Sequence, residues 1–79
     1  MESVLVCLPP DERRAATILA EAAKIADELN AELSVVHLYP ESWRGPVKPL
    51  PNAWYIKTDE PAEAIGRFVS RHRFTRVVC

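Results

Sequence analysis

The chain has little glycine and little cysteine, with two residues of each among 79. Both glycines, Gly45 and Gly66, lie far from the first apolar run, so no glycine-rich turn follows that run. The cysteines, Cys7 and Cys79, form no CxxC pair and stand beside no histidine cluster, which leaves a zinc site without support. Both fall in apolar runs, where an unpaired cysteine usually packs as a small hydrophobe. We therefore expect no metal site, no disulfide scaffold and two buried thiols.

An excess of charge of one sign and a long hydrophobic run are also missing. Ten basic and eleven acidic residues give a formal net charge of −1, which creates no broad field to attract nucleic acid or an anionic membrane. No apolar run approaches the roughly 20 residues of a membrane-spanning helix, and the first residues lack the pattern of a secretory signal. We expect a cytoplasmic chain with neither nucleic acid nor membrane as a direct partner.

Hydrophobic residues are plentiful, at 48%, beside 27% charged residues, which is the composition of an ordinary globular chain. A chain of 79 residues makes one small domain, here residues 1–79. At this size folding hides only about 60% of the surface that the unfolded chain exposes. The core is therefore expected to be thin.

The first half of the sequence reads as strand, helix, strand. The run SVLVCL, Ser3–Leu8, is almost continuously apolar, as in a strand that is covered on both faces. Pro9 and Pro10 end it, and Asp11 is suited to cap the helix that follows. One apolar stripe runs along that helix: Ala15, Ile18, Leu19, Ala22, Ile25, Ala26 and Leu29. Asn30 is available to end the helix, and AELSVVHLY returns as a second strand.

The second half begins with a loop and ends with another helix and strand. PESWRGPVKPLPN, from Pro40 to Asn52, contains four prolines and a glycine, which forbid a regular helix or a central strand. The run AWYIK is predicted to be the third strand, and TRVVC is predicted to be the fourth. Between them, residues 59–74 are predicted to form a helix whose inward side chains are Ala62, Ile65, Phe68 and Val69. Asp59, Glu60 and Glu63 are expected to favour the helix start rather than to act as catalytic acids.

These elements predict the α/β class: a small, doubly wound parallel sheet of about four strands with two main helices. One connection between strands has become the proline-rich loop. One face of the sheet is therefore expected to be poorly covered, which favours self-association as a homodimer or contact with other domains of a longer chain.

The order of these motifs resembles the universal stress protein family, most closely its version inside Kdp-type potassium sensor histidine kinases. The resemblance covers nearly the whole chain: SVLVCLPPDERRAATILAEAAKIADELNAELSVVHLY is similar to the first strand, helix and second strand, and DEPAEAIGRFVSRHRFTRVVC to the later helix and strand. It implies an adenine nucleotide alpha hydrolase-like fold in a truncated or degenerate form. The proline-rich loop stands where the family has a helix.

The resemblance also implies a function: a non-catalytic regulatory or interaction module in signal transduction or stress response, inside a two-component system. Open α/β sheets bind ligands outside the carboxyl ends of their strands. Carried over position by position, a retained ligand pocket consists of Leu8, Pro9, Pro10 and Leu38. The alternative is an adenine-nucleotide-binding universal stress protein, which keeps the pocket for the base and takes phosphate contacts from a partner chain. Nucleotide-binding members are similar in having an aspartate where this chain has Pro9, and a glycine-rich loop after the fourth strand, where this chain stops at Cys79.

An alternative enzyme hypothesis starts from Cys7 and Arg13, which are spaced as in the phosphate loop of low-molecular-weight protein tyrosine phosphatases. That chemistry needs a thiolate and a ring of backbone N–H donors. Pro9 and Pro10 remove two donors, and the acidic pair that follows repels a phosphate. A structural role for Cys7 is therefore preferred.

The remaining hypotheses concern partners. Arg67 and Arg71 belong to the one basic concentration of the sequence and are possible contacts for an acidic partner. Trp43 flanks the proline-rich loop, where it either pins the loop to the sheet or meets a partner. His37 lies in an apolar strand and is expected to be a hydrogen-bonded core histidine.

Overall fold

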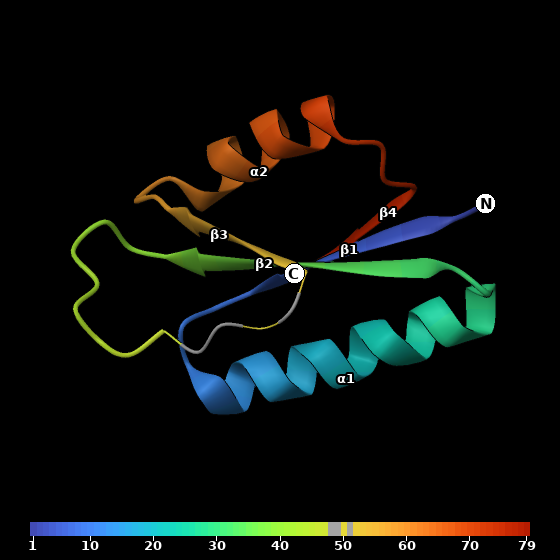
Figure 1. Cartoon of the computed structure of the whole chain (residues 1–79), viewed down its shortest axis with the longest axis horizontal. Coiled ribbons are helices and arrows are strands. Elements are labelled where there is room, and N and C mark those ends of the chain that lie inside the picture. The colour runs from blue at the N-terminus through green and yellow to red at the C-terminus, as the bar shows by residue number, and fades with distance from the viewer. Residues whose placement is uncertain (48–49, 51) are drawn as a thin grey trace.

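A four-stranded parallel sheet with one helix on each face makes up the chain in the computed structural model, which describes residues 1–47, 50 and 52–79 (Figure 1). In chain order the elements are β1 (Ser3–Leu8), α1 (Glu12–Leu29), β2 (Glu32–Tyr39), β3 (Ala53–Lys57), α2 (Pro61–Arg71) and β4 (Arg76–Val78). The strand order is β3-β2-β1-β4, and every neighbouring pair is parallel. The predicted α/β class, parallel sheet and two helices are confirmed.

Strand β1 lies inside the sheet, between β2 and β4. Its residues from Val4 to Leu8 are all buried, as the continuous apolar run predicts. Side chains that alternate along the strand serve two cores. Leu5 and Cys7 pack with Val36 on the α2 face, while Val6 and Leu8 pack with Ala22 on the α1 face.

Helix α1 begins and ends where the sequence indicates. Asp11 is its N-cap, and its side chain accepts hydrogen bonds from the backbone N–H groups of Arg13 and Arg14 at 2.9 and 3.1 Å. Asn30 closes the helix in the left-handed conformation, with φ of 53°. The predicted apolar stripe faces the sheet, and Ala22 and Ala26 are its fully buried members. Small side chains at these two positions bring the helix close to β1.

Helix α2 covers the opposite face, which makes the sheet doubly wound as predicted (Figure 1). Its partly buried residues Ile65, Phe68 and Val69 pack against the core beneath it. The predicted inward position of Ala62 is wrong: Ala62 is exposed and Ala64 is buried. The helix also ends at Arg71, three residues before the prediction, because His72 adopts an extended backbone.

The last strand is shorter than TRVVC predicts, and this changes the place of Cys79. Strand β4 pairs with β1 only from Arg76 to Val78, so Cys79 follows the strand at the edge of the sheet. Cys7 is buried, but Cys79 is exposed. The prediction of two buried thiols is therefore wrong for Cys79, because no element covers this position among the residues that the structure describes.

The segment from Pro40 to Asn52 joins β2 to β3, and positions 48, 49 and 51 of it lie outside the described residues. Its described part contains turns and bends but no helix, as predicted. Trp43 folds back against Tyr39, with ring centroids 5.5 Å apart, and its backbone N–H donates to the carbonyl of Pro40 at 3.0 Å. A Cβ atom on Gly45 would collide with the Trp43 ring. Glycine at this position therefore permits the close approach that pins the loop.

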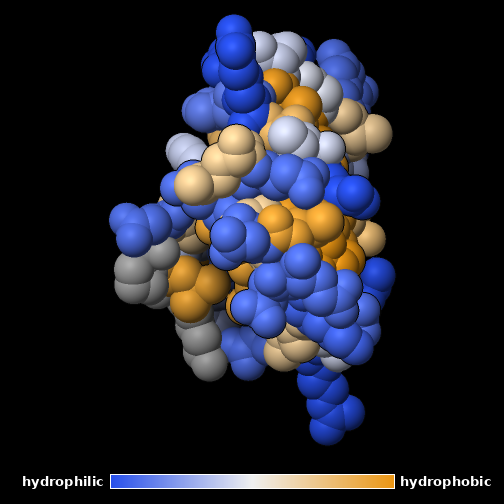
Figure 2. Space-filling model, turned by 90° about the vertical axis from the view of Figure 1, so that its right-hand side faces the viewer, coloured by the Kyte–Doolittle hydropathy of each residue, from blue (hydrophilic) through white to orange (hydrophobic). Residues whose placement is uncertain are grey.

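Figure 2 shows the side of the molecule that lies to the right in Figure 1. Over much of this surface, hydrophilic residues are interspersed among hydrophobic ones. No helix within the described ranges combines the length and the apolar character that a membrane crossing requires.

Candidate functional site

The candidate site is a pocket at the carboxyl edge of the sheet. Strand β1 leads from this edge into α1 on one face, whereas β3 leads into α2 on the other (Figure 1). Connections that leave a parallel sheet in opposite directions open a crevice between them, and open α/β sheets bind their ligands there. A pocket of about 600 Å³ occupies this place.

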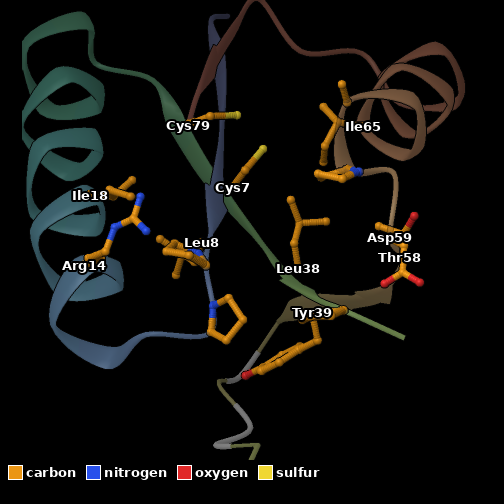
Figure 3. Close-up of a pocket in the computed structure, with 15 residues that line it drawn as sticks. Cys7, Leu8, Arg14, Ile18, Leu38, Tyr39, Thr58, Asp59, Ile65 and Cys79 are labelled. Atoms are coloured by element: carbon orange, nitrogen blue, oxygen red, sulfur yellow. The ribbon is translucent and has the colours of Figure 1, made fainter. Parts of the chain in front are cut away.

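All four residues predicted for ligand binding line this pocket. Leu8 ends β1, Pro9 and Pro10 follow it, and Leu38 lies near the end of β2 (Figure 3). Ile18 of α1 and Ile65 of α2 add apolar walls from opposite sides of the sheet. The structure therefore brings together the residues that the resemblance placed in one site, and surrounds them with further aliphatic side chains.

The polar groups of the pocket stand at its rim. Arg14 comes from the first turns of α1, and Thr58 and Asp59 come from the turn after β3, across the pocket (Figure 3). Sequence reasoning missed all three. A signal was available for the last two, because residues that follow a parallel strand lie at the same edge as those that follow β1.

The turn after β3 is held by hydrogen bonds to the end of β2. The backbone N–H of Thr58 donates to the carbonyl of Tyr39 at 2.8 Å, and the Thr58 hydroxyl accepts from the N–H of Glu60 at 2.9 Å. The Asp59 carboxylate accepts from the N–H of Glu41 at 3.1 Å. Asp59 thus does not cap α2, and Glu60 takes the N-cap position without a side-chain hydrogen bond. These bonds fix the rim on the α2 side of the pocket.

Tyr39, at the end of β2, also lines the pocket (Figure 3). Burial raises the pKa of Tyr39, and nearby Tyr55 and Glu12 add to the shift. The phenol therefore stays protonated at neutral pH and keeps a hydrogen to donate.

Cys7 lines the pocket floor but is not poised as a nucleophile. Its side chain is 3% exposed, and burial, a hydrogen bond with the Cys79 side chain and the charge of Cys79 together raise its pKa to about 12. A catalytic thiol requires a shift in the opposite direction. Arg13, its partner in the phosphatase hypothesis, lies on the exposed side of α1 and does not line this pocket. Asp11 already occupies two N-terminal amides of α1 that a phosphate would use.

A second, smaller hollow of about 260 Å³ lies between α1, the end of β2 and the loop after it, with His37 at its base. His37 is 8% exposed and stacks between Tyr39 and Tyr55, at centroid distances of 6.0 and 5.1 Å. Neither ring nitrogen has a hydrogen-bond partner within the described part of the chain, so the predicted hydrogen bond of this core histidine is not found. Burial lowers the pKa of His37, which keeps the ring neutral at neutral pH.

The three predicted partner residues do not form one surface. Arg67 and Arg71 line a groove between β3 and α2 together with Lys57, and Arg67 pairs with Glu63 at 3.4 Å. Trp43 does not line that groove; it is half-buried against Tyr39. The structure thus favours the pinning role for Trp43 and leaves the arginines on a separate, basic groove.

Metal binding has no structural basis in residues 1–47, 50 and 52–79, where no three His, Cys, Asp or Glu side chains gather as ligands. Comparison of the chain with protein-family models, with curated proteins and with solved structures found no match.

Proposed function

We propose that this chain is a non-catalytic regulatory module that binds a small-molecule ligand at the carboxyl edge of its sheet. The observation that carries the proposal is the pocket of about 600 Å³ formed by Leu8, Pro9, Pro10 and Leu38 between the two helices. Aliphatic and proline walls with a few polar groups at the rim are typical of small-molecule sites.

The absence of assembled catalytic groups supports a binding role. Among the described residues of the pocket, the buried Cys7 thiol has a raised pKa, and neither histidine lines the walls. A general base or an activated nucleophile needs a partner within hydrogen-bond reach. The Asp59 carboxylate accepts a hydrogen bond from the backbone N–H of Glu41 in the loop, so this bond does not orient a catalytic base or nucleophile.

The rim favours an adenine nucleoside or monophosphate over a triphosphate. Arg14 is the one cationic side chain that the structure describes along the pocket walls, and Asp59 across from it repels added negative charge. A flat heteroaromatic ring suits the apolar walls and leaves its polar edge for Thr58 at the rim. Adenine is the ring implied by the resemblance to universal stress proteins.

On this proposal the chain is a trimmed universal-stress-like domain that serves signal transduction, as in a potassium sensor kinase, and acts as a homodimer or beside other domains of a longer cytoplasmic chain. The parallel α/β sheet with helices on both faces is compatible with that family. The assignment itself rests on the resemblance of the sequence.

Titration of the backbone amides by NMR with adenosine, AMP, ATP and cyclic di-AMP tests the proposal. We expect shifts at Leu8 and Asp11, which flank the two prolines, at Leu38 and Tyr39, and at Thr58 and Asp59, with ATP binding no tighter than AMP. Ala62→Phe should fill the pocket mouth and abolish the shifts, because Ala62 lines it. Ala23→Phe is the matched control, since Ala23 is an exposed helix residue outside the pocket.

Variants of two neighbouring arginines distinguish binding in the pocket from a general attraction of anions. Arg14→Gln should weaken AMP binding roughly tenfold, the worth of one charge-assisted hydrogen bond, while Arg13→Gln should leave it unchanged. Equal effects of the two variants would indicate diffuse electrostatics. A flat response to all four ligands in a folded sample would rule out the nucleotide ligand.

A further inference from the structure

Cys7 and Cys79 are neighbours across two adjacent strands. The register of β1 and β4 pairs Leu5 with Val77 and Val6 with Val78. Continued by one residue, it places Cys79 beside Cys7, and both side chains belong to the α2 side of the sheet. The two thiols come together in Figure 3, where both line the pocket.

The two thiols differ in access. Cys7 is 3% exposed, whereas Cys79 is exposed beyond the last residue of β4. The continued register places the second thiol beside the first. A small oxidant therefore reaches Cys79 first and finds the second thiol next to it.

We propose that Cys7 and Cys79 form a reversible disulfide at the floor of the pocket when the chain meets a hydroperoxide. Adjacent parallel strands lie about 4.8 Å apart, inside the roughly 4.4–6.8 Å between Cα atoms that disulfides span. The Cβ atoms must still draw slightly closer. Cys79 can make that movement without breaking the β4 ladder, because it lies outside the strand.

The chemistry takes two steps. The Cys79 sulfur attacks the peroxide O–O bond: an S–O bond forms, the O–O bond breaks, and the leaving oxygen departs with the thiol proton as water or an alcohol. Cys79 is then a sulfenic acid, and the peroxide is reduced. Next the Cys7 sulfur attacks the Cys79 sulfur, so that the S–S bond forms, the S–O bond breaks and the hydroxide leaves as water with the proton of Cys7.

The environments of Cys7 and Cys79 determine which thiol reacts first. Burial raises the pKa of Cys7 to about 12, so this residue carries almost no thiolate for the first attack. Its position beside Cys79 on the neighbouring strand suits it for the second, resolving step. Such a disulfide is a modification of the folded chain rather than a structural crosslink, and its formation requires no ligand in the pocket.

Hydrogen peroxide treatment of the dilute, folded chain tests the proposal, with free thiols counted and intact mass measured. We expect both thiols to disappear, the monomer to lose the mass of two hydrogen atoms, and peptide mapping to join Cys7 to Cys79. Dithiothreitol should restore both thiols. Cys79→Ser, an exposed and mild change, should leave Cys7 unreactive until the chain is unfolded. In Cys7→Ala, Cys79 should accumulate as a sulfenic acid that dimedone traps.

Three outcomes would overturn the proposal. The first is a peroxide-treated chain that keeps both thiols under conditions that oxidise Cys79 in Cys7→Ala. The second is a covalent dimer through Cys79 as the main product of the unsubstituted chain. The third is loss of the Cys7 thiol in folded Cys79→Ser at the rate seen in the unsubstituted chain.

Discussion

His37 shows at the scale of one residue how a polar side chain can occupy an apolar core. Its ring is stacked between two tyrosines, which accounts for its burial without a hydrogen bond inside the described part of the chain. Buried polar atoms without partners are uncommon and costly. The neutral ring reduces this cost, whereas a protonated ring would place a charge in the core.

The lowered pKa of His37 gives stability a defined pH dependence. The folded state binds a proton less readily than the unfolded chain, in which the pKa is near the ordinary 6.5. The contribution is therefore complete above pH 6.5 and is lost as the pH falls through the lower folded-state pKa. His37→Phe keeps an aromatic ring in the stack and removes the titration. Urea unfolding between about pH 7 and pH 5 should give a shallower loss of stability in His37→Phe than in the unsubstituted chain. If the two proteins lose the same stability between these pH values, the pKa of His37 is the same in the folded and the unfolded chain.

At the scale of elements, β1, β3 and the start of α1 could be predicted closely, because continuous apolar runs and a capping aspartate are local signals. The end of α2 could not. His72 leaves the helix although the sequence RHRF shows no breaker, and its ring packs against Trp54 of β3 with ring centroids 5.3 Å apart. Tertiary contacts of this kind leave no periodic pattern in the sequence.

The site was predictable to the same extent. The rule that ligands bind at the carboxyl ends of strands predicts the edge of the sheet, and the resemblance to universal stress proteins implied Leu8, Pro9, Pro10 and Leu38, which line the pocket there. The α2 side of the pocket, with Thr58 and Asp59, depends on β3 lying beside β2, which requires the strand order. That order is a property of the whole sheet.

The two glycines should respond in opposite ways to the same change. A Cβ atom at Gly66, in the middle of α2, would touch nothing within 4 Å, so Gly66→Ala should raise stability by about 0.5–1 kcal/mol through helix propensity. Gly45→Ala should instead displace the Trp43 ring from its place and lower stability by roughly 1 kcal/mol. Thermal unfolding measures both. A stabilising effect at Gly45 would contradict the pinning role of Trp43.

At the scale of the whole molecule, the fold depends on contacts between segments far apart in the chain. Ser3 and Thr75, 72 positions apart, exchange hydrogen bonds through the backbone and through the Thr75 hydroxyl. The hydroxyl accepts from the N–H of Ser3 and donates to its carbonyl, at 3.0 Å in each case. These bonds start the pairing of β4 with β1.

Thr75→Val should therefore lower the free energy of unfolding by about 1 kcal/mol, since it removes both side-chain bonds and preserves the shape. Thr17→Val is the matched control, because the Thr17 hydroxyl bonds only the carbonyl of Arg13 one turn away in α1. Urea denaturation of the two variants compares them. Equal losses of unfolding free energy in the two variants would mean that the hydrogen bonds between Ser3 and Thr75 stabilise the fold no more than a local hydrogen bond within α1 does.

The interior position of β1 also has a consequence for synthesis of the chain on the ribosome. β1 and β2 can pair as soon as α1 and β2 have emerged, but the other edge of β1 gains its partner only when residues 76–78 are free. Until then the unpaired backbone of an apolar strand is open to other nascent chains. Of the four strands, the one that is made first is thus the last to gain both of its neighbours.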